Sequence, residues 1–301
     1  MFLSLLVDAG VPSLDLQRDG LLITYWYRLQ RQPNNPAYTV AIDTTVDIQY
    51  RNKPLLPRPF RLRVRNVIGD LLLPNFPIAV YQVPPIAPWE FPNTHFCRYF
   101  NFTKESISTS TARQLFLSHT ASHATSVPVY TDGSKSDAGV GFGAVFPDFS
   151  RSGTLPAIAS IFTAELSALL LAIRTIFTLR VDTLTVYCDS QAALSTIEDF
   201  RSTHPIVLGI FSWLVLTKRR GHQVTFCWVP AHVSVRGNEK ADEVARAAAS
   251  RPPSQCALPF RNLYTTVRSA LQRVWQCRWV AVIATTKMGE VSAVLPWSYS
   301  L

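Results

Sequence analysis

The sequence predicts an α/β fold in which a mixed five-stranded sheet, with three antiparallel and two parallel strands, is flanked by helices. Three β-like segments follow one another in the middle of the chain, at 127–133, 139–146 and near 155–161. Two later segments, TLTVYCD (183–189) and VTFCWVP (224–230), are each reached through helical sequence. Consecutive strands form an antiparallel meander, whereas strands that follow a helical crossover pair in parallel.

Four helices are expected around this sheet. TAELSALLLAIRTIF (163–177) has apolar residues three or four positions apart, which is typical of an amphipathic helix. A short helix is expected at 190–197 and a longer one at 204–220, which ends in basic residues. The last helix, NEKADEVARAAA (238–249), would begin with Asn238 as its N-cap. The expected order is β-β-β-α-β-α-α-β-α.

The charge distribution separates the centre of the chain from its flanks. The 301 residues have a net charge of +9 and are 48% hydrophobic, ample for a packed core. Residues 127–250 carry 11 basic and 11 acidic side chains, whereas 251–301 carry 6 and 1 and residues 1–126 carry 12 and 8. Basic flanks suit a polyanionic partner, although surplus arginine also serves solubility alone.

Four segments are therefore expected. Residues 1–107 are rich in Pro, aromatics and Arg, 108–126 form a linker with a short helical patch, 127–250 form the central domain, and 251–301 form a basic tail. Within the first segment, a helix is expected near Leu21–Leu29 and a sheet-like stretch near Tyr38–Tyr50.

The cysteines and apolar runs indicate an intracellular protein, in the nucleus or cytoplasm, that is not secreted. None of the five cysteines forms a CxxC pair, so neither a disulfide framework nor a zinc knuckle is expected. The apolar start lacks a basic region and is interrupted by Asp8, unlike a signal peptide. The run 206–216 is too short to span a bilayer, which needs about 20 residues. No membrane contact is expected.

Four acidic residues occupy comparable positions in the expected elements. Asp132 would end the first strand, Glu165 would open the long helix, Asp189 would end the fourth strand, and Asp242 would lie in the first turn of the last helix. Strand ends and helix starts meet at one sheet edge. Taken alone, each of these acids is more often a turn residue, a helix cap or a complement to the helix dipole than a metal ligand, so the inference depends on the set.

Converging carboxylates repel one another and favour a bound cation. At about 4 Å the repulsion is roughly 4 kcal/mol at an effective dielectric of 20. Ligand sets made only of oxygen select Mg²⁺ or Mn²⁺ rather than Zn²⁺. Two such ions can activate a water and stabilise the leaving oxygen in phosphodiester hydrolysis. The expected cofactor is two Mg²⁺ ions, with Mn²⁺ as a substitute and no small-molecule cofactor.

The blocks YTDGS, TAEL, CDSQAAL and WVPAHVSVRGNEKADEVA resemble, in order, the four signature blocks of type I ribonuclease H. The resemblance covers about 125 residues. It implies a ribonuclease H-like fold for 127–250 and endonucleolytic cleavage of the RNA strand of RNA/DNA hybrids. It also implies that Asp132, Glu165, Asp189 and Asp242 are catalytic metal ligands.

The same resemblance implies roles for further residues. His232 matches the family's mobile histidine, which aids proton transfer or product release. The expected substrate-binding residues lie in the same blocks: Gly133, Ser134, Ser190, Gln191 and Asn238. Contact in the minor groove would recognise the 2′-hydroxyl of RNA.

The chain departs from the family pattern in two places. Ser234 stands where the family usually has a glycine, two residues after the histidine, and few residues separate 190–197 from 204–220, which leaves no room for an extra basic helix. Two alternatives to an active nuclease therefore stay open. One is a catalytically degenerate remnant that binds nucleic acid; the other is a transposase or integrase of the same fold, which the order of the acids argues against.

The flanks, 1–107 and 257–301, resemble the regions that follow the polymerase and the ribonuclease H domain in arthropod non-LTR retrotransposon proteins. The chain contains no Tyr/Phe-x-Asp-Asp polymerase signature. This resemblance implies a C-terminal piece of such a polyprotein, with the polymerase part as a further partner.

Overall fold

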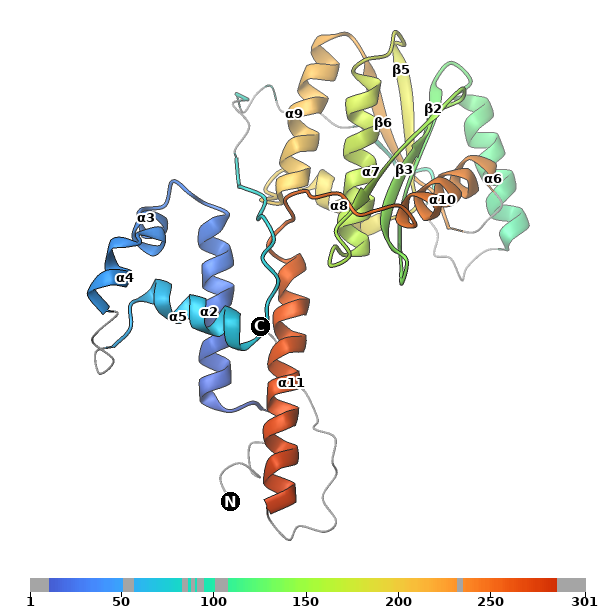
Figure 1. The fold of residues 1–301 in the computed structure, drawn as a ribbon. Coiled ribbons are helices and arrows are strands. Elements are labelled where there is room, and N and C mark those ends of the chain that lie inside the picture. Colours follow the sequence, from blue (N-terminus) through green and yellow to red (C-terminus); the bar gives the residue numbers. More distant parts are fainter. Residues whose placement is uncertain are drawn as a thin grey trace. The chain divides into compact units, whose positions relative to one another are not determined.

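The computed structural model describes residues 11–50, 57–82, 86–87, 90, 95–100, 108–231 and 235–285. They belong to two compact units, the first made of 1–80 and 257–301 and the second of 81–256 (Figure 1). The second unit holds the sheet and the first is helical in its described part. Among the described residues, no helix has the length and apolar character needed to cross a membrane.

A mixed six-stranded sheet forms the centre of the second unit, in the order β1-β6-β5-β2-β3-β4. The strands are β1 (His95–Cys97), β2 (Val127–Ser136), β3 (Gly139–Val145), β4 (Ser150–Leu155), β5 (Thr183–Cys188) and β6 (Gln223–Trp228). β2, β3 and β4 pair antiparallel, and β1, β6, β5 and β2 pair in parallel. The mixed sheet and the order of its elements from β2 onward are as predicted.

Two details of the prediction were wrong. The sheet has six strands rather than five, because β1 adds a three-residue parallel edge to β6. So short a strand, within Pro-rich sequence, has no readable alternation. The third strand is β4 at 150–155 rather than 155–161, since pairing with β3 begins at Ser150 and Pro156 follows the last paired residue.

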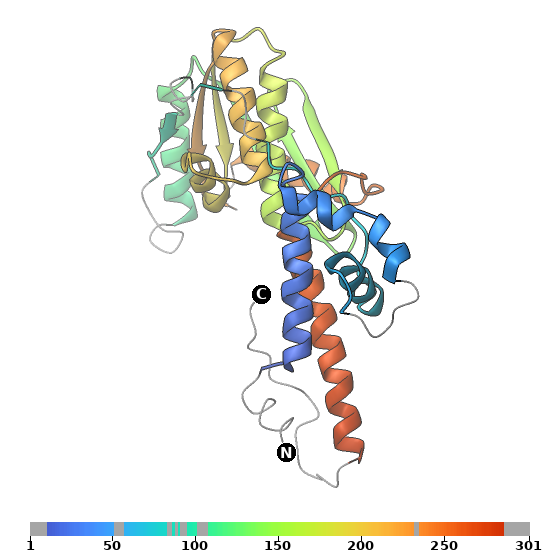
Figure 2. The same cartoon turned by 90° about the vertical axis from the view of Figure 1, so that its left-hand side faces the viewer.

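Helices cover both faces of the sheet (Figures 1 and 2). On one face, α7 (Ile161–Ile176), α8 (Gln191–Glu198) and α9 (Pro205–Arg219) enclose the main core with Val186 and Phe226. On the other face, Tyr187 and Cys227 pack against α6 (Thr109–Ser122). Because neighbouring strand residues point to opposite faces, β5 and β6 contribute to both cores. The expected linker 108–126 thus contains a 14-residue helix.

The helix α10 (Arg236–Ala249) packs closely on the sheet over glycines of β3. A Cβ at Gly141 would overlap the backbone of Ala245 and Ala249 and lie 2.9 Å from the carbonyl carbon of Ala248. The Gly-rich sequence of β3 therefore lets the helix backbone approach the strand.

The described part of the first unit contains five helices: α2 (Leu14–Gln30), α3 (Pro36–Ile42), α4 (Thr45–Tyr50), α5 (Phe60–Asp70) and α11 (Asn262–Thr285). The helix expected near Leu21–Leu29 lies within α2, but the sheet-like stretch near Tyr38–Tyr50 was wrong. Asn35 caps α3, its side chain accepting from the Ala37 N–H, and Pro36 suits the first helical position.

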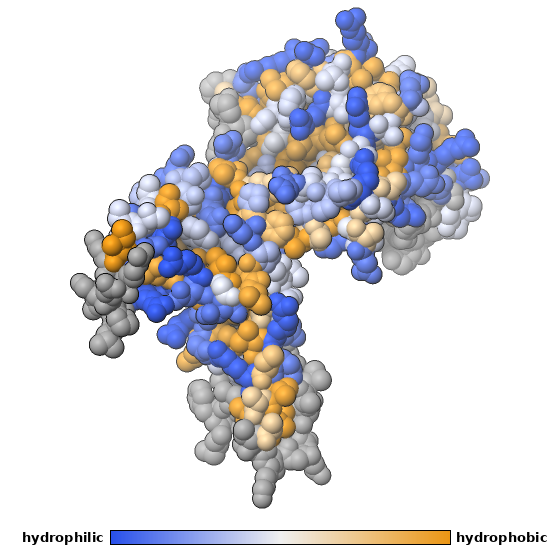
Figure 3. All heavy atoms as spheres, in the orientation of Figure 1, coloured by the Kyte–Doolittle hydropathy of each residue, from blue (hydrophilic) through white to orange (hydrophobic). Residues whose placement is uncertain are grey.

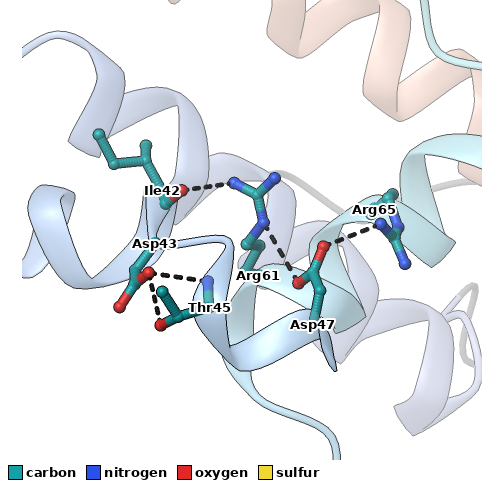
Figure 4. A network of polar contacts seen from close by, with 6 residues as sticks. All are labelled: Ile42, Asp43, Thr45, Asp47, Arg61 and Arg65. Atoms are coloured by element: carbon teal, nitrogen blue, oxygen red, sulfur yellow. Dashed lines mark hydrogen bonds and ion pairs between the residues drawn. The ribbon is translucent and has the colours of Figure 1, made fainter. Parts of the chain in front are cut away.

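An ionic contact joins α4 to α5. Asp47 pairs with Arg61 at 3.4 Å and with Arg65 at 3.1 Å, and Arg61 also donates to the Ile42 carbonyl (Figure 4). These arginines are thus partly neutralised within the fold.

The molecular surface in Figure 3 displays hydrophilic and apolar side chains side by side.

Gly141→Ala is expected to destabilise the second unit by about 1–3 kcal/mol, because the added methyl group meets helix backbone that cannot rotate away. Gly209→Ala in α9 is the matched control. There the new Cβ lies 3.7 Å from the Leu170 side chain, an ordinary contact distance. The replacement should stabilise the helix by about 0.5–1 kcal/mol, because alanine favours the helical backbone more than glycine does. Urea unfolding of both variants gives the comparison; equal stability of the two would contradict the close packing of α10.

Candidate functional site

Asp132 lies within β2 rather than at its end, because β2 continues to pair with β3 as far as Ser136. Its side chain is buried, with the residue 6% exposed, and Oδ1 accepts the backbone N–H of Gly133 at 2.9 Å. A carboxyl group is thus fixed in the interior of the sheet.

Gly133 brings α7 against β2 directly beside this carboxyl. A Cβ at this position would lie 2.6 Å from the Glu165 nitrogen and 2.8 Å from the carbonyl carbon of Ala164. Only glycine permits that separation. Glu165 lies in the second turn of α7 rather than at its start, because Ser160 caps the helix and Ile161 begins it.

The carboxyl groups of Asp132 and Glu165 share a hydrogen bond and strongly perturb one another. Burial and the charge of Asp189 raise the pKa of Asp132 to about 7. Burial, with the charges of Asp132 and Asp189, raises the pKa of Glu165 to about 9. Oε2 of Glu165 is buried and has no hydrogen-bond partner among the described residues.

Asp189 directly follows β5, which ends one residue earlier than predicted, and it is held by two other elements. Asn238 Nδ2 donates to its Oδ2 at 3.2 Å, and Trp228 Nε1 donates to its backbone carbonyl at 3.0 Å. Asn238 was expected to cap α10. Instead it is the third residue of that helix, whose N-cap is Val235, and its buried side chain orients Asp189.

Asp242 lies in the second turn of α10 rather than the first, because the helix begins at Arg236. Both of its carboxylate oxygens are bound by Arg246, one turn further along the helix. The positive charge of Arg246 also acts on Asp132. The structure thus brings Asp132, Glu165 and Asp189 together. Asp242 is paired with Arg246, whose positive charge acts to lower the pKa of Asp132.

The other predicted site residues are placed as follows. Ser190 caps α8 and accepts from the Ala193 N–H at 3.3 Å, and Gln191 is exposed at the first position of that helix. Ser134 follows Gly133 in β2 and is half-buried. His232 and Ser234 lie outside the described residues.

Three further residues at the site were not predicted. Cys188 is fully buried, and its sulfur lies within 4.8 Å of a carboxylate oxygen of both Glu165 and Asp189. The other two are Trp228, which donates to the Asp189 backbone carbonyl, and Arg246, which donates to the Asp242 carboxylate. The spacing of Asp242 and Arg246 could have revealed their pairing, since residues four apart on a helix are neighbours. No spacing links Cys188 or Trp228 to the acids.

The arrangement fits hard divalent cations. Its converging donors are carboxylate oxygens, and one of them, Oε2 of Glu165, is buried without a partner in the described structure. A divalent cation favours the ionised carboxylates, thereby opposing both raised pKa values. Cys188, the one soft ligand nearby, is kept as a neutral thiol because burial raises its pKa far above the usual value.

The raised pKa values predict how metal-free stability varies with pH. Both folded-state values exceed the unfolded ones, so the folded chain retains protons that the unfolded chain has released. Stability should therefore fall as pH rises from about 4 to about 9. At pH 8, Asp132→Asn should raise the free energy of unfolding by about 1–4 kcal/mol, with little gain at pH 4. Urea unfolding in EDTA measures this, with the exposed-loop variant Asp148→Asn as control; an unchanged pH profile would contradict the assignment.

Comparison with known proteins agrees with this geometry. A search of curated proteins found no match to the chain. The family model described as RNase H matches residues 124–250, a span that contains all four acids and His232. Residues 124–250 are therefore similar in sequence to RNase H domains.

Proposed function

We propose that the chain hydrolyses the RNA strand of RNA/DNA hybrids endonucleolytically, with two divalent cations held by Asp132, Glu165, Asp189 and Asp242. The observation that carries this is the pair of buried, mutually perturbed carboxyls, Asp132 and Glu165, beside Asp189. Burial of such a pair is unfavourable without a counter-ion. Mg²⁺ is the expected ion, and Mn²⁺ should substitute for it.

When bound, the ions supply an activated water and stabilise the leaving oxygen. The chain's own residues position the reactants. The hydrogen-bonded backbone of β2 fixes Asp132, Gly133 holds α7 against it, and Asn238 orients Asp189. Ser134 lies in β2 two residues after Asp132, and Ser190 and Gln191 follow Asp189 at the start of α8. All three would contact the hybrid.

A second function is favoured by one observation. Arg246 binds both oxygens of Asp242, so that the fourth acid is neutralised within its own helix. A chain that retains this pair with substrate present would bind hybrids without cutting them. The presence of Ser234 in place of a loop glycine also favours this second function. Release of fragments from labelled hybrid distinguishes the two functions, because both predict binding but only the first predicts cleavage.

Asp132→Asn should reduce Mg²⁺-dependent cleavage of hybrid to background while leaving the fold intact, because the variant keeps the shape of the side chain but loses its charge. Asp148→Asn, in an exposed loop of the same unit, should cleave like the wild type. Labelled single-stranded RNA and double-stranded DNA serve as substrate controls. Near wild-type cleavage by Asp132→Asn would overturn the metal-site assignment.

His232→Ala should slow turnover by roughly 10²–10⁴-fold, the usual range for a positioned acid or base. Hybrid binding, measured in Ca²⁺ to suppress cleavage, should change little, because the ligand carboxylates are intact. Asp189→Asn should remove activity altogether. If His232→Ala cleaves at the wild-type rate, the histidine has no part in turnover.

The same proposal extends to the basic segments on either side of the domain and to a partner protein. The basic flanks, within 1–126 and 251–301, would add affinity for the hybrid, and their resemblance to non-LTR retrotransposon sequence suggests a parent polymerase as partner. The expected domain boundaries and a nuclear or cytoplasmic location remain predictions.

A further inference from the structure

A second group of metal-ligating side chains lies away from the acids, where α6 covers the sheet. It consists of Cys97 in β1, His119 in α6 and Cys227 in β6, with all three ligand atoms within 4.8 Å of one another. Cys97 and Cys227 are register partners in adjacent parallel strands. Three separate elements thus bring two sulfurs and an imidazole nitrogen together.

The separation of Cys227 and His119 is close to that of neighbouring ligands around a tetrahedral zinc ion, and Cys97 Sγ lies within 4.8 Å of both ligand atoms. Zn–S bonds of about 2.3 Å and Zn–N bonds of about 2.0–2.1 Å place neighbouring ligand atoms about 3.6–3.8 Å apart. Cys227 Sγ lies 3.8 Å from His119 Nε2. Little movement of the side chains would be needed to admit the ion.

His119 is a buried polar group that its surroundings leave poorly satisfied. The residue is 1% exposed, and Nδ1 has no hydrogen-bond partner among the described residues. Nε2 lies 3.8 Å from the Cys227 sulfur, which is a weak hydrogen-bond partner. The His123 ring lies nearest to the imidazole, at 4.3 Å between centroids, and the rings of Tyr99, Phe100 and Tyr187 lie at 4.9, 5.5 and 6.0 Å. Burying a polar ring in this way is unfavourable unless something binds it.

We propose that Cys97, His119 and Cys227 bind one Zn²⁺ ion. Two thiolates balance the charge of the ion, which suits a largely buried site. Soft sulfur ligands select zinc over the Mg²⁺ of the acidic site. Binding releases the two thiol protons, and the fourth position falls to a water that enters beside the half-buried Cys97.

The ion would fasten the edge of the sheet. β1 has three residues, and its pairing with β6 supplies few hydrogen bonds. A zinc ion shared by β1, α6 and β6 would hold all three together independently of the hydrolytic reaction. The proposed zinc site does not depend on the proposed function.

Cobalt substitution tests the proposal, because thiolate ligands give Co²⁺ an intense near-ultraviolet charge-transfer band that carboxylate ligands do not. The full chain is purified under reducing conditions, its zinc content is measured, and the metal-free protein is titrated with Co²⁺. We expect one zinc per chain and the thiolate band on cobalt binding. Cys97→Ser should weaken binding at least about 100-fold, whereas Cys277→Ser, an exposed cysteine outside the group, should leave it unchanged.

Cys97 is the first choice for substitution because it is only half-buried, and circular dichroism with urea unfolding shows whether the variant folds. His119→Gln gives a second test that keeps both sulfurs. Absence of the thiolate band in the wild type, an equal band in Cys97→Ser, or a Cys97–Cys227 disulfide in place of zinc would each overturn the proposal. Hybrid cleavage can fail without affecting any of these readouts.

Discussion

The close contact between α7 and β2 at Gly133 sets the arrangement of the candidate site. The absence of a side chain there lets the helix backbone come within van der Waals range of the strand, so that Glu165 lies against Asp132. Both carboxyl groups are then buried within reach of the charge on Asp189, and their pKa values rise to about 9 and 7. In the metal-free chain this group is electrostatically unfavourable, and cations of the proposed kind would relieve it.

The same sheet carries two sets of ligands of different chemical hardness. The acids gather around the middle strand β2, where oxygen donors suit Mg²⁺. Cys97 and Cys227 lie at the far parallel edge, where sulfur and nitrogen donors suit Zn²⁺. If both ions bind, ligand chemistry alone would keep them apart, because neither set suits the other's metal.

Regular patterns in the sequence made much of the fold of the second unit predictable. The apolar spacing of α7 and the Gly-rich β3 are readable in sequence, and so is the order of elements from β2 to α10. Features that depend on contacts distant in sequence were not readable. β1 is too short to show alternation, and Cys97, His119 and Cys227 lack any motif spacing, so that a zinc site was not expected. Helix starts shifted by a few residues, which moved Glu165 and Asp242 into second turns and Asn238 away from a cap.

The most direct test of the account is to locate the cations themselves. Crystals of the chain with an RNA/DNA hybrid, soaked in Mn²⁺, would show bound manganese by anomalous scattering. We expect manganese peaks at the carboxylates of Asp132, Glu165 and Asp189, with Asp242 released from Arg246. Crystals with ordered hybrid but no manganese at these carboxylates, and with Arg246 still on Asp242, would contradict it.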